Sequence, residues 1–190
     1  MEQPHDTAIG SFAVEKTSLY AQALWITVFA ALTAIGAQIE IPHQPVPYTL
    51  QTLFVLLSGA FLGKRNGALS QALYLFGGLI GVPVFSGFGF GIARLIGPTG
   101  GYLISFPIAA FAVGYLLNKN PRVLRTIISM LVGLFIIFSL GTLQLNFVYY
   151  HNWSDAFTHG FLIFSWWDVM KLTAAVAIYH QFTRKQVSAS

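Results

Sequence analysis

The feature that most constrains this chain is a series of long stretches without a charged side chain. Five of them are Thr17–Ile39, Ile41–Gly63, Asn66–Ala93, Leu95–Asn118 and Thr126–Ser154, and a sixth apolar segment, Gly160–Phe182, carries only Asp168 and Lys171. About 20 apolar residues are enough for a helix to cross the hydrocarbon core of a bilayer. The sequence therefore predicts an all-α integral membrane protein with six transmembrane helices.

The predicted helices divide the chain into three parts. The six predicted helices are Leu19–Ile39, Leu50–Leu62, Gly67–Val82, Gly101–Leu117, Thr126–Tyr150 and Phe161–Phe182. The second and third are short enough to tilt or break. Together the six helices form one transmembrane domain, residues 19–183, between an N-terminal segment (1–18) and a C-terminal tail (184–190).

Composition narrows the function classes. Of the 190 residues, 55% are hydrophobic and only 8% are charged, which excludes an ordinary soluble enzyme and a disordered chain. The net charge of +4 comes from small basic groups between apolar runs, so nucleic-acid binding is not expected. Because the chain has no cysteine, it has no disulfide, no thiolate metal site and no cysteine nucleophile.

Basic residues lie unequally on the two sides of the predicted helices. One side has Lys16, Lys64, Arg65, Lys119, Arg122, Arg125, Arg184 and Lys185, and the other has Arg94 alone. Because cytoplasmic loops are enriched in Lys and Arg, both termini are predicted to be cytoplasmic. Residues 1–16 contain four charges and no apolar core, so no cleaved signal peptide is predicted.

Glycine and proline interrupt the chain between the third and fourth predicted helices. Nine of the 18 glycines lie in residues 77–101, together with Pro83 and Pro98. Glycine permits unusual backbone angles and proline lacks an amide donor, so this segment is predicted to be a re-entrant or lid loop. Non-helical backbone within a membrane must be buried in protein or line a cavity. A flexible external loop is the alternative.

A second break precedes the second predicted helix. Three prolines in residues 42–47 predict an extended connection that ends the first helix. Thr49, which follows, could simply cap the next helix. The amide of Gln51 needs hydrogen-bond partners, so Gln51 is expected to face a polar cavity and not lipid.

Three ionisable residues lie in the predicted membrane region. Asp168 and Lys171 are three positions apart, so they share a helical face and can pair; counted from Phe161, they lie about 10 to 15 Å along the helix. Charges inside a membrane are usually functional, although a structural ion pair is the alternative. Arg94 adds a second positive charge, so the positive charges outnumber the single carboxylate of Asp168. A cavity with this charge balance and apolar walls suits a ligand that carries a carboxylate.

Signatures of catalysis are missing from the sequence. Neither the ATP-binding pattern GxxxxGK[ST] nor the dinucleotide-binding pattern GxGxxG occurs. The five histidines (His5, His43, His151, His159 and His180) lack zinc-ligand spacing, so no metal site is predicted. One acid beside one lysine does not make a hydrolase, and the chain is predicted not to be an enzyme.

Four motifs together resemble one family of membrane proteins. Pro45–Thr52 (PVPYTLQT), Gly81–Phe85 (GVPVF), Gly97–Leu103 (GPTGGYL) and Asp168–Lys171 (DVMK) are similar, in order and spacing, to BioY, the biotin-binding S component of energy-coupling-factor (ECF) vitamin transporters. The resemblance covers the chain from about Ala30 to Leu172. One departure is Trp166–Trp167, where the family usually has Pro-Gly.

The resemblance implies a function, a location and partners. A BioY protein has six helices in the bacterial cell membrane, captures biotin from outside and delivers it to the cytoplasm, and needs no cofactor. Its partners are membrane lipid, a transmembrane T subunit and two cytoplasmic ATPases, which hydrolyse the ATP. Some members of the family transport biotin without that module, and an S component for another small carboxylated vitamin is the alternative.

The resemblance also implies roles for individual residues. Lys171 and Arg94 would face the biotin carboxylate and Asp168 would accept a hydrogen bond from a ureido N–H group, although the reverse assignment of the two ends is the alternative. The remaining candidates are Gln51 and Tyr74 as polar contacts, Phe85 and Tyr102 as apolar walls, Ala30 and Ala34 as small residues facing the T subunit, and Gly87–Gly91 as a lid.

Overall fold

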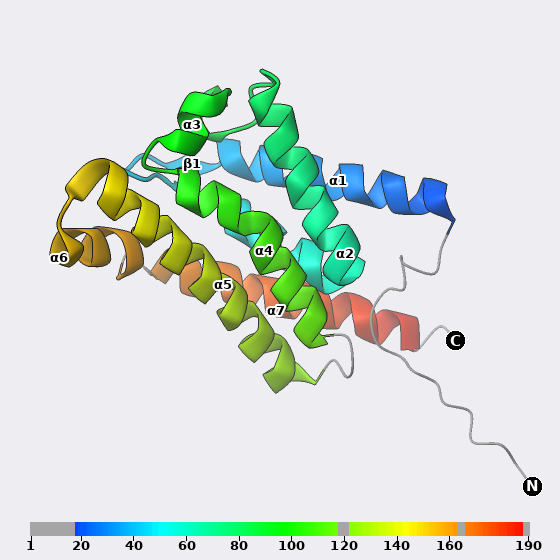
Figure 1. Cartoon of the computed structure of the whole chain (residues 1–190). Helices are drawn as coiled ribbons and strands as arrows, with labels where there is room; N and C mark the ends of the chain where they lie inside the picture. Colours follow the sequence, from blue (N-terminus) through cyan, green and yellow to red (C-terminus); the bar gives the residue numbers. More distant parts are fainter. Residues whose placement is uncertain (1–17, 118–121, 163–165, 188–190) are drawn as a thin grey trace, which may run out of the picture.

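The computed structural model describes residues 18–117, 122–162 and 166–187. These residues are mostly helical, with one short two-stranded sheet (Figure 1). In chain order the elements are α1 (Leu19–Gln38), β1 (Glu40–Ile41), β2 (Tyr48–Thr49), α2 (Gln51–Leu79), η2 (Ser86–Phe88), α3 (Ile92–Ile96), α4 (Gly100–Leu117), α5 (Val123–Leu145), η3 (Asn146–Tyr150), α6 (Trp153–Ala156), η4 (Phe157–Phe161) and α7 (Trp166–Val187). The two strands pair antiparallel, with Glu40 opposite Thr49, and bring the proline-rich connection back to the start of α2.

Several helices have the length and apolar character of membrane spans. Leu19–Gln38, Gly100–Leu117 and Val123–Tyr150 meet this description, and the bent pair of Trp153–Phe161 and Trp166–Thr183 would add a fourth span. The predicted helical fold is therefore confirmed, with three or four candidate membrane spans among the described residues. The count of six spans stays a prediction.

Helix α2 joins two helices that were predicted to be separate. Only Gly63 has non-helical backbone angles inside it, with φ 77° and ψ −178°, a conformation that glycine adopts with little strain. Gly114 of α4 packs against the backbone at this point so closely that a Cβ atom on Gly114 would overlap Lys64. The predicted break between two helices is present at Gly63, but the connection is shorter than the predicted residues 63–66, because helical structure resumes directly after Gly63.

The last helix differs from its predicted bounds. Residues Trp153–Phe161, expected to be mostly loop, form α6 and η4, whereas α7 begins only at Trp166 and continues to Val187. The axes of Trp153–Phe161 and Trp166–Thr183 differ by 45°. Asp168 therefore lies in the first turn of α7 as described.

The apolar core lies between α2 and α4 and extends to α5 and α7. The two central helices approach closely where Gly59 faces the Ala110 backbone, since a Cβ atom on Gly59 would overlap the Ala110 carbonyl. Side chains with no exposed surface at the centre of the core are Val55, Leu56, Ala109, Ala110, Val113, Met130, Ala175 and Tyr179. This packing fixes the ends of α2, α4, α5 and α7, which surround the site described below.

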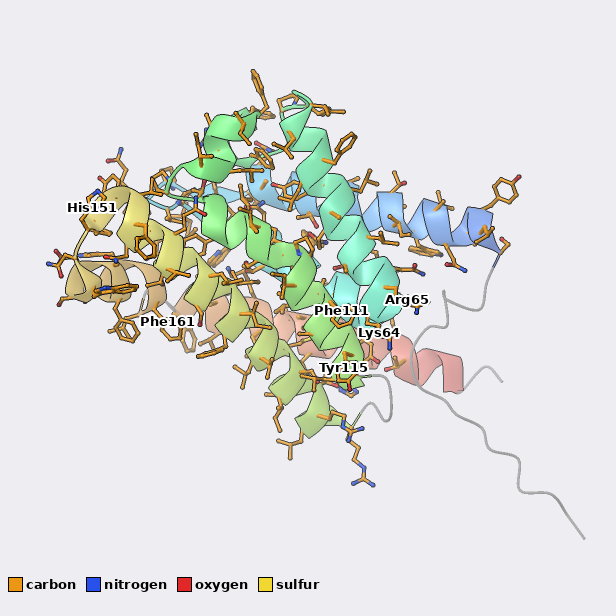
Figure 2. The ribbon with its side chains drawn as sticks, in the orientation of Figure 1. Lys64, Arg65, Phe111, Tyr115, His151 and Phe161 are labelled. Atoms are coloured by element: carbon orange, nitrogen blue, oxygen red, sulfur yellow. The ribbon has the colours of Figure 1, made fainter. Side chains whose placement is uncertain are left out.

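The two ends of the helix bundle differ in character. Figure 2 shows Lys64 and Arg65 at the opposite end of the molecule from His151. The Lys64 ammonium lies 5.6 Å from the centre of the Tyr115 ring, and this ring stacks on Phe111 with 6.3 Å between the ring centres. The other end of the molecule carries β1, α3 and α6 (Figure 1). The bend of α2 beside Lys64 and Arg65 is therefore far from the glycine-rich loop that precedes α3.

Candidate functional site

One cavity at the α3 end collects residues from distant parts of the sequence. Its lining comes from the β2 region and the start of α2, the loop before α4, and helices α3, α4, α5 and α7. The lining residues are Val46, Pro47, Tyr48, Thr49, Gln51, Thr52, Phe85, Ser86, Arg94, Thr99, Tyr102, Leu103, Phe106, Ile137, Phe138, Asp168 and Lys171. Six of the seven predicted ligand-binding residues are among them, and Tyr74 lies just behind. The free space is about 70 Å³, which holds only a few water molecules.

A buried ion pair forms one side of the cavity. The Lys171 Nζ atom lies 2.6 Å from Asp168 Oδ1, and the two side chains are only 6% and 2% exposed. Lys171 also donates a hydrogen bond of 3.1 Å to the Thr49 carbonyl, which ties α7 to the residue that precedes α2. Burial and the nearby Asp168 carboxylate raise the pKa of Tyr48, which lies outside the helices on β2. The pair as a whole adds no net charge to the cavity.

Arg94 contributes an unbalanced positive charge. It belongs to the short helix α3 and is half-buried, with its guanidinium against the backbone of Gly89, where a Cβ atom would overlap the Arg94 side chain. Among the residues that the structure describes, Arg94 forms no ion pair. It also lines a second, more open pocket with Glu40 and His43. Arg94 is therefore positioned to bind an anionic group between the two pockets.

Gln51 is held in place by its neighbours. Its Nε2 atom donates to the Tyr74 hydroxyl at 2.6 Å, and its Oε1 atom accepts from the Thr49 hydroxyl at 2.8 Å. The Tyr74 hydroxyl in turn donates to the Val84 carbonyl at 3.3 Å. Gln51 lines the cavity as expected, whereas Tyr74 is 3% exposed and acts on the cavity through Gln51.

Aromatic rings form the apolar walls. Phe85 is 1% exposed, and its ring lies directly over Gly78 and packs edge-on against Tyr74 with 5.5 Å between the ring centres. The Tyr102 hydroxyl donates to the Gly160 carbonyl at 2.9 Å, so this side chain presents its ring to the cavity and its polar atom to η4. Both residues occupy the wall positions that the sequence predicted.

Several lining residues were not assigned to the site from the sequence. Ile137 and Phe138 come from α5, where they lie in the run Leu131–Phe138, which contains no polar side chain to mark a cavity. Thr52 was noticed only as part of a motif. Its hydroxyl is buried and, within the described ranges, has no hydrogen-bond partner. A buried hydroxyl of this kind is a candidate for bonding to a ligand.

Four other predicted residues lie outside the cavity. Trp166 is 77% exposed, Trp167 is half-buried, and neither lines the cavity. Ala30 is 8% exposed, and Ala34 packs against the same core. Ala34 is only partly buried, and the expectation that Ala30 and Ala34 face a partner stays a prediction.

Comparison with known proteins agrees with these features. Residues 11–187 match the BioY family. The chain is 43% identical over 160 residues to a biotin transporter BioY of Thermotoga maritima, covering 84% of this chain and 94% of that protein. It is 44% identical over 154 residues to a probable biotin transporter BioY of Pyrococcus horikoshii, covering 80% and 90%.

A solved structure has the same fold. The crystal structure at 2.1 Å of the S component for biotin from an ECF-type ABC transporter superposes with a TM-score of 0.79 at 26% sequence identity, covering 87% of this chain and 92% of that one. The family predicted from the four sequence motifs is confirmed by the match over nearly the whole chain, and the chain belongs to the BioY family.

Proposed function

We propose that this chain is a substrate-binding subunit for biotin uptake, which captures biotin outside the cell and delivers it to the cytoplasm. The names of its relatives and of the solved S component support this function. The observation that carries it is the meeting of Arg94, Asp168 and Lys171 at one small cavity with aromatic walls. The chain is a transporter subunit and not an enzyme, because it binds its substrate without changing it.

The chemistry of biotin fits this cavity. Biotin has a carboxylate on an apolar tail, a thioether ring and a ureido group with two N–H donors. Arg94 faces the carboxylate. Because Lys171 and Asp168 pair at 2.6 Å, they face one end of the ligand together, where Asp168 accepts a hydrogen bond from a ureido N–H group. Gln51, held by Tyr74, is a polar contact, and Phe85 and Tyr102 pack against the rings. Charge-assisted hydrogen bonds of this kind are about twice as strong as neutral ones.

Binding requires the site to open. The free space of about 70 Å³ is well below the roughly 300–1,000 Å³ of pockets that hold small ligands. The glycine-rich stretch Gly87–Gly91 covers the site from outside and serves as its lid. Gly87 and Gly91 have φ values of 61° and 84°, which glycine adopts readily, so the stretch is suited to a change of conformation.

The membrane topology has six spans with both termini in the cytoplasm. The transmembrane domain is residues 19–183, between cytoplasmic segments 1–18 and 184–190, and α2 supplies two spans that meet at Gly63. Lys64 and Arg65 (Figure 2) lie away from α3, the helix that carries Arg94 (Figure 1), which supports this orientation under the positive-inside rule. The protein resides in the cell membrane.

Other protein chains supply the energy for transport. A transmembrane T subunit and two ATPases form the partner module, in keeping with the absence of a P-loop from this sequence. Helix α1 contacts the T subunit through the face that carries Ala30 and Ala34, of which Ala34 is only partly buried by its own chain. Co-purification with the module tests this assembly, and biotin uptake by liposomes containing this chain alone would favour the stand-alone alternative.

The binding function is tested by isothermal titration of the detergent-purified chain. We expect biotin to bind one-to-one, and thermal unfolding to shift upward with biotin and not with other carboxylated vitamins. If a different vitamin gives the binding heat and the upward shift of thermal unfolding, that vitamin is the substrate of the site. If a folded sample responds to no vitamin, the proposed function is wrong.

A further inference from the structure

A short loop separates two pockets at the outer end of the molecule. The inner pocket is the cavity of about 70 Å³ described above, and the outer pocket, of about 410 Å³, is lined by Glu40, His43 and Gly87 among others. Both pockets share Pro47, Ser86 and Arg94. Phe85 and Gly89 close the loop between them through two backbone hydrogen bonds of 3.0 and 3.1 Å.

Gln38, at the C-terminal end of α1, holds this loop by its side-chain amide. The Nε2 atom donates to the Phe85 carbonyl at 3.0 Å and lies 3.4 Å from the Val84 carbonyl. The Oε1 atom accepts from the Phe88 N–H group at 3.0 Å. One side chain from another helix therefore binds both the start and the middle of the loop.

The loop segment that Gln38 binds is conformationally strained. Phe88 has φ 55°, in the left-handed region that is unfavourable for a residue with a bulky side chain. Its side chain is 69% exposed, so packing does little to hold it in place. Such strain persists where surrounding contacts enforce it, and the Gln38 bond to the Phe88 amide is such a contact.

The flanks of the loop are anchored separately. The Gly91 N–H group donates to the Gly78 carbonyl at 2.8 Å, and the Tyr74 hydroxyl donates to the Val84 carbonyl at 3.3 Å. Beyond α3, Gln144 donates to the carbonyls of Leu95 and Gly97 at 2.7 and 2.8 Å. If the Gln38 bonds break, the freed segment is Ser86–Gly89, because the Phe85 ring stays buried over Gly78 and the flanks stay in place.

We propose that Gln38 is a positioning residue that keeps the Phe85–Gly89 loop closed as the partition between the two pockets. Release of its hydrogen bonds joins the pockets, and a carboxylated ligand passes from the outer pocket along Arg94 into the inner one. The identity of the ligand rests on the proposed function; the role of Gln38 rests on the contacts above.

Stopped-flow measurement of biotin binding to the purified full chain tests this role. In Gln38→Leu we expect the association and dissociation rate constants both to rise about tenfold, because two hydrogen bonds no longer hold the closed loop, while Kd changes less. Gln181→Leu, the same change at an exposed position on α7, is the matched control and leaves both rate constants unchanged. A merely structural role for Gln38 would instead raise Kd without speeding association.

A second measurement needs no ligand. Hydrogen–deuterium exchange over residues 84–90 is expected to be faster in Gln38→Leu than in the wild-type chain. If Gln38→Leu does not fold, Gln38→Glu replaces it in both measurements, since it keeps an acceptor for Phe88 and loses the donor to Phe85 and Val84. Unchanged exchange, or faster exchange with unchanged rate constants, overturns the proposal. Failure of the wild-type chain to bind biotin would overturn the proposed function instead, and the exchange measurement would still test Gln38.

Discussion

The Lys171 ammonium lies 2.6 Å from the Asp168 carboxylate in the first turn of α7, with both side chains almost fully buried. A buried pair of this kind is costly to break on one side, because the remaining charge is left without its partner. It is much less costly to replace as a whole. Comparison of the single and double substitutions therefore distinguishes a pair that binds a ligand from a pair that only stabilises the fold.

We therefore expect Asp168→Asn and Lys171→Met each to lower the free energy of unfolding by about 3 to 5 kcal/mol and to abolish biotin binding. The double variant should recover most of the stability and still not bind biotin. Thermal unfolding and titration calorimetry measure the two effects, with Arg65→Met as a control at the opposite end. Wild-type affinity in a folded double variant would show that the pair serves only the fold.

Arg94 provides a test of the carboxylate end of the ligand. Arg94→Ala should weaken biotin binding about 10- to 100-fold, since a hydrogen bond to a charged group contributes about 1.5 to 3 kcal/mol. The methyl ester of biotin lacks the negative charge, so the same substitution should change its Kd only slightly. Competition titration with both ligands gives the comparison. Equal losses for the acid and the ester would mean that Arg94 does not face the carboxylate.

Thr52 provides a test of a single hydroxyl. Thr52→Val keeps the shape of the side chain and removes a buried hydroxyl that has no partner in the described part of the chain. We expect biotin binding to weaken about fivefold, which corresponds to one hydrogen bond of about 1 kcal/mol. Thr27→Val is the control, because the Thr27 hydroxyl bonds only within α1 and lies outside the cavity. Unchanged affinity in Thr52→Val would remove Thr52 from the site.

Two adjacent glycines test the position of Phe85. A Cβ atom on Gly78 would overlap the Phe85 ring, whereas a Cβ atom on Gly77 has no atom within 4 Å. Gly78→Ala should displace Phe85, lower the free energy of unfolding by about 1 to 3 kcal/mol and weaken biotin binding. Gly77→Ala should leave binding unchanged and slightly raise the thermal unfolding temperature, because alanine favours a helix. Equal behaviour of the two variants would show that the Phe85 wall can move without affecting the site.

The site was predicted from the sequence mainly where a polar residue interrupts an apolar run. Arg94, Asp168, Lys171 and Gln51 were identified in this way, because polar groups in a membrane segment need a partner or a cavity. Gln38 carries the same kind of amide, but its place at the end of a helix gave no reason to assign it to the glycine-rich loop. Ile137 and Phe138 could not be identified, since α5 is apolar over most of its length.

The sequence by itself determined that this chain is an α-helical membrane protein, that its glycine-rich segment is irregular and that three ionisable residues need a protected site. These properties follow from local composition, because lipid tolerates only long apolar helices and few unpaired charges. Only the tertiary structure decided that α2 bends at Gly63 alone, that α7 starts at Trp166 and that Ala30 faces the core. It also decided that Gln38 reaches Phe85 and Phe88. These features depend on contacts between segments that are far apart in the chain. The sequence of an apolar helix does not indicate such contacts, because all sides of the helix are alike.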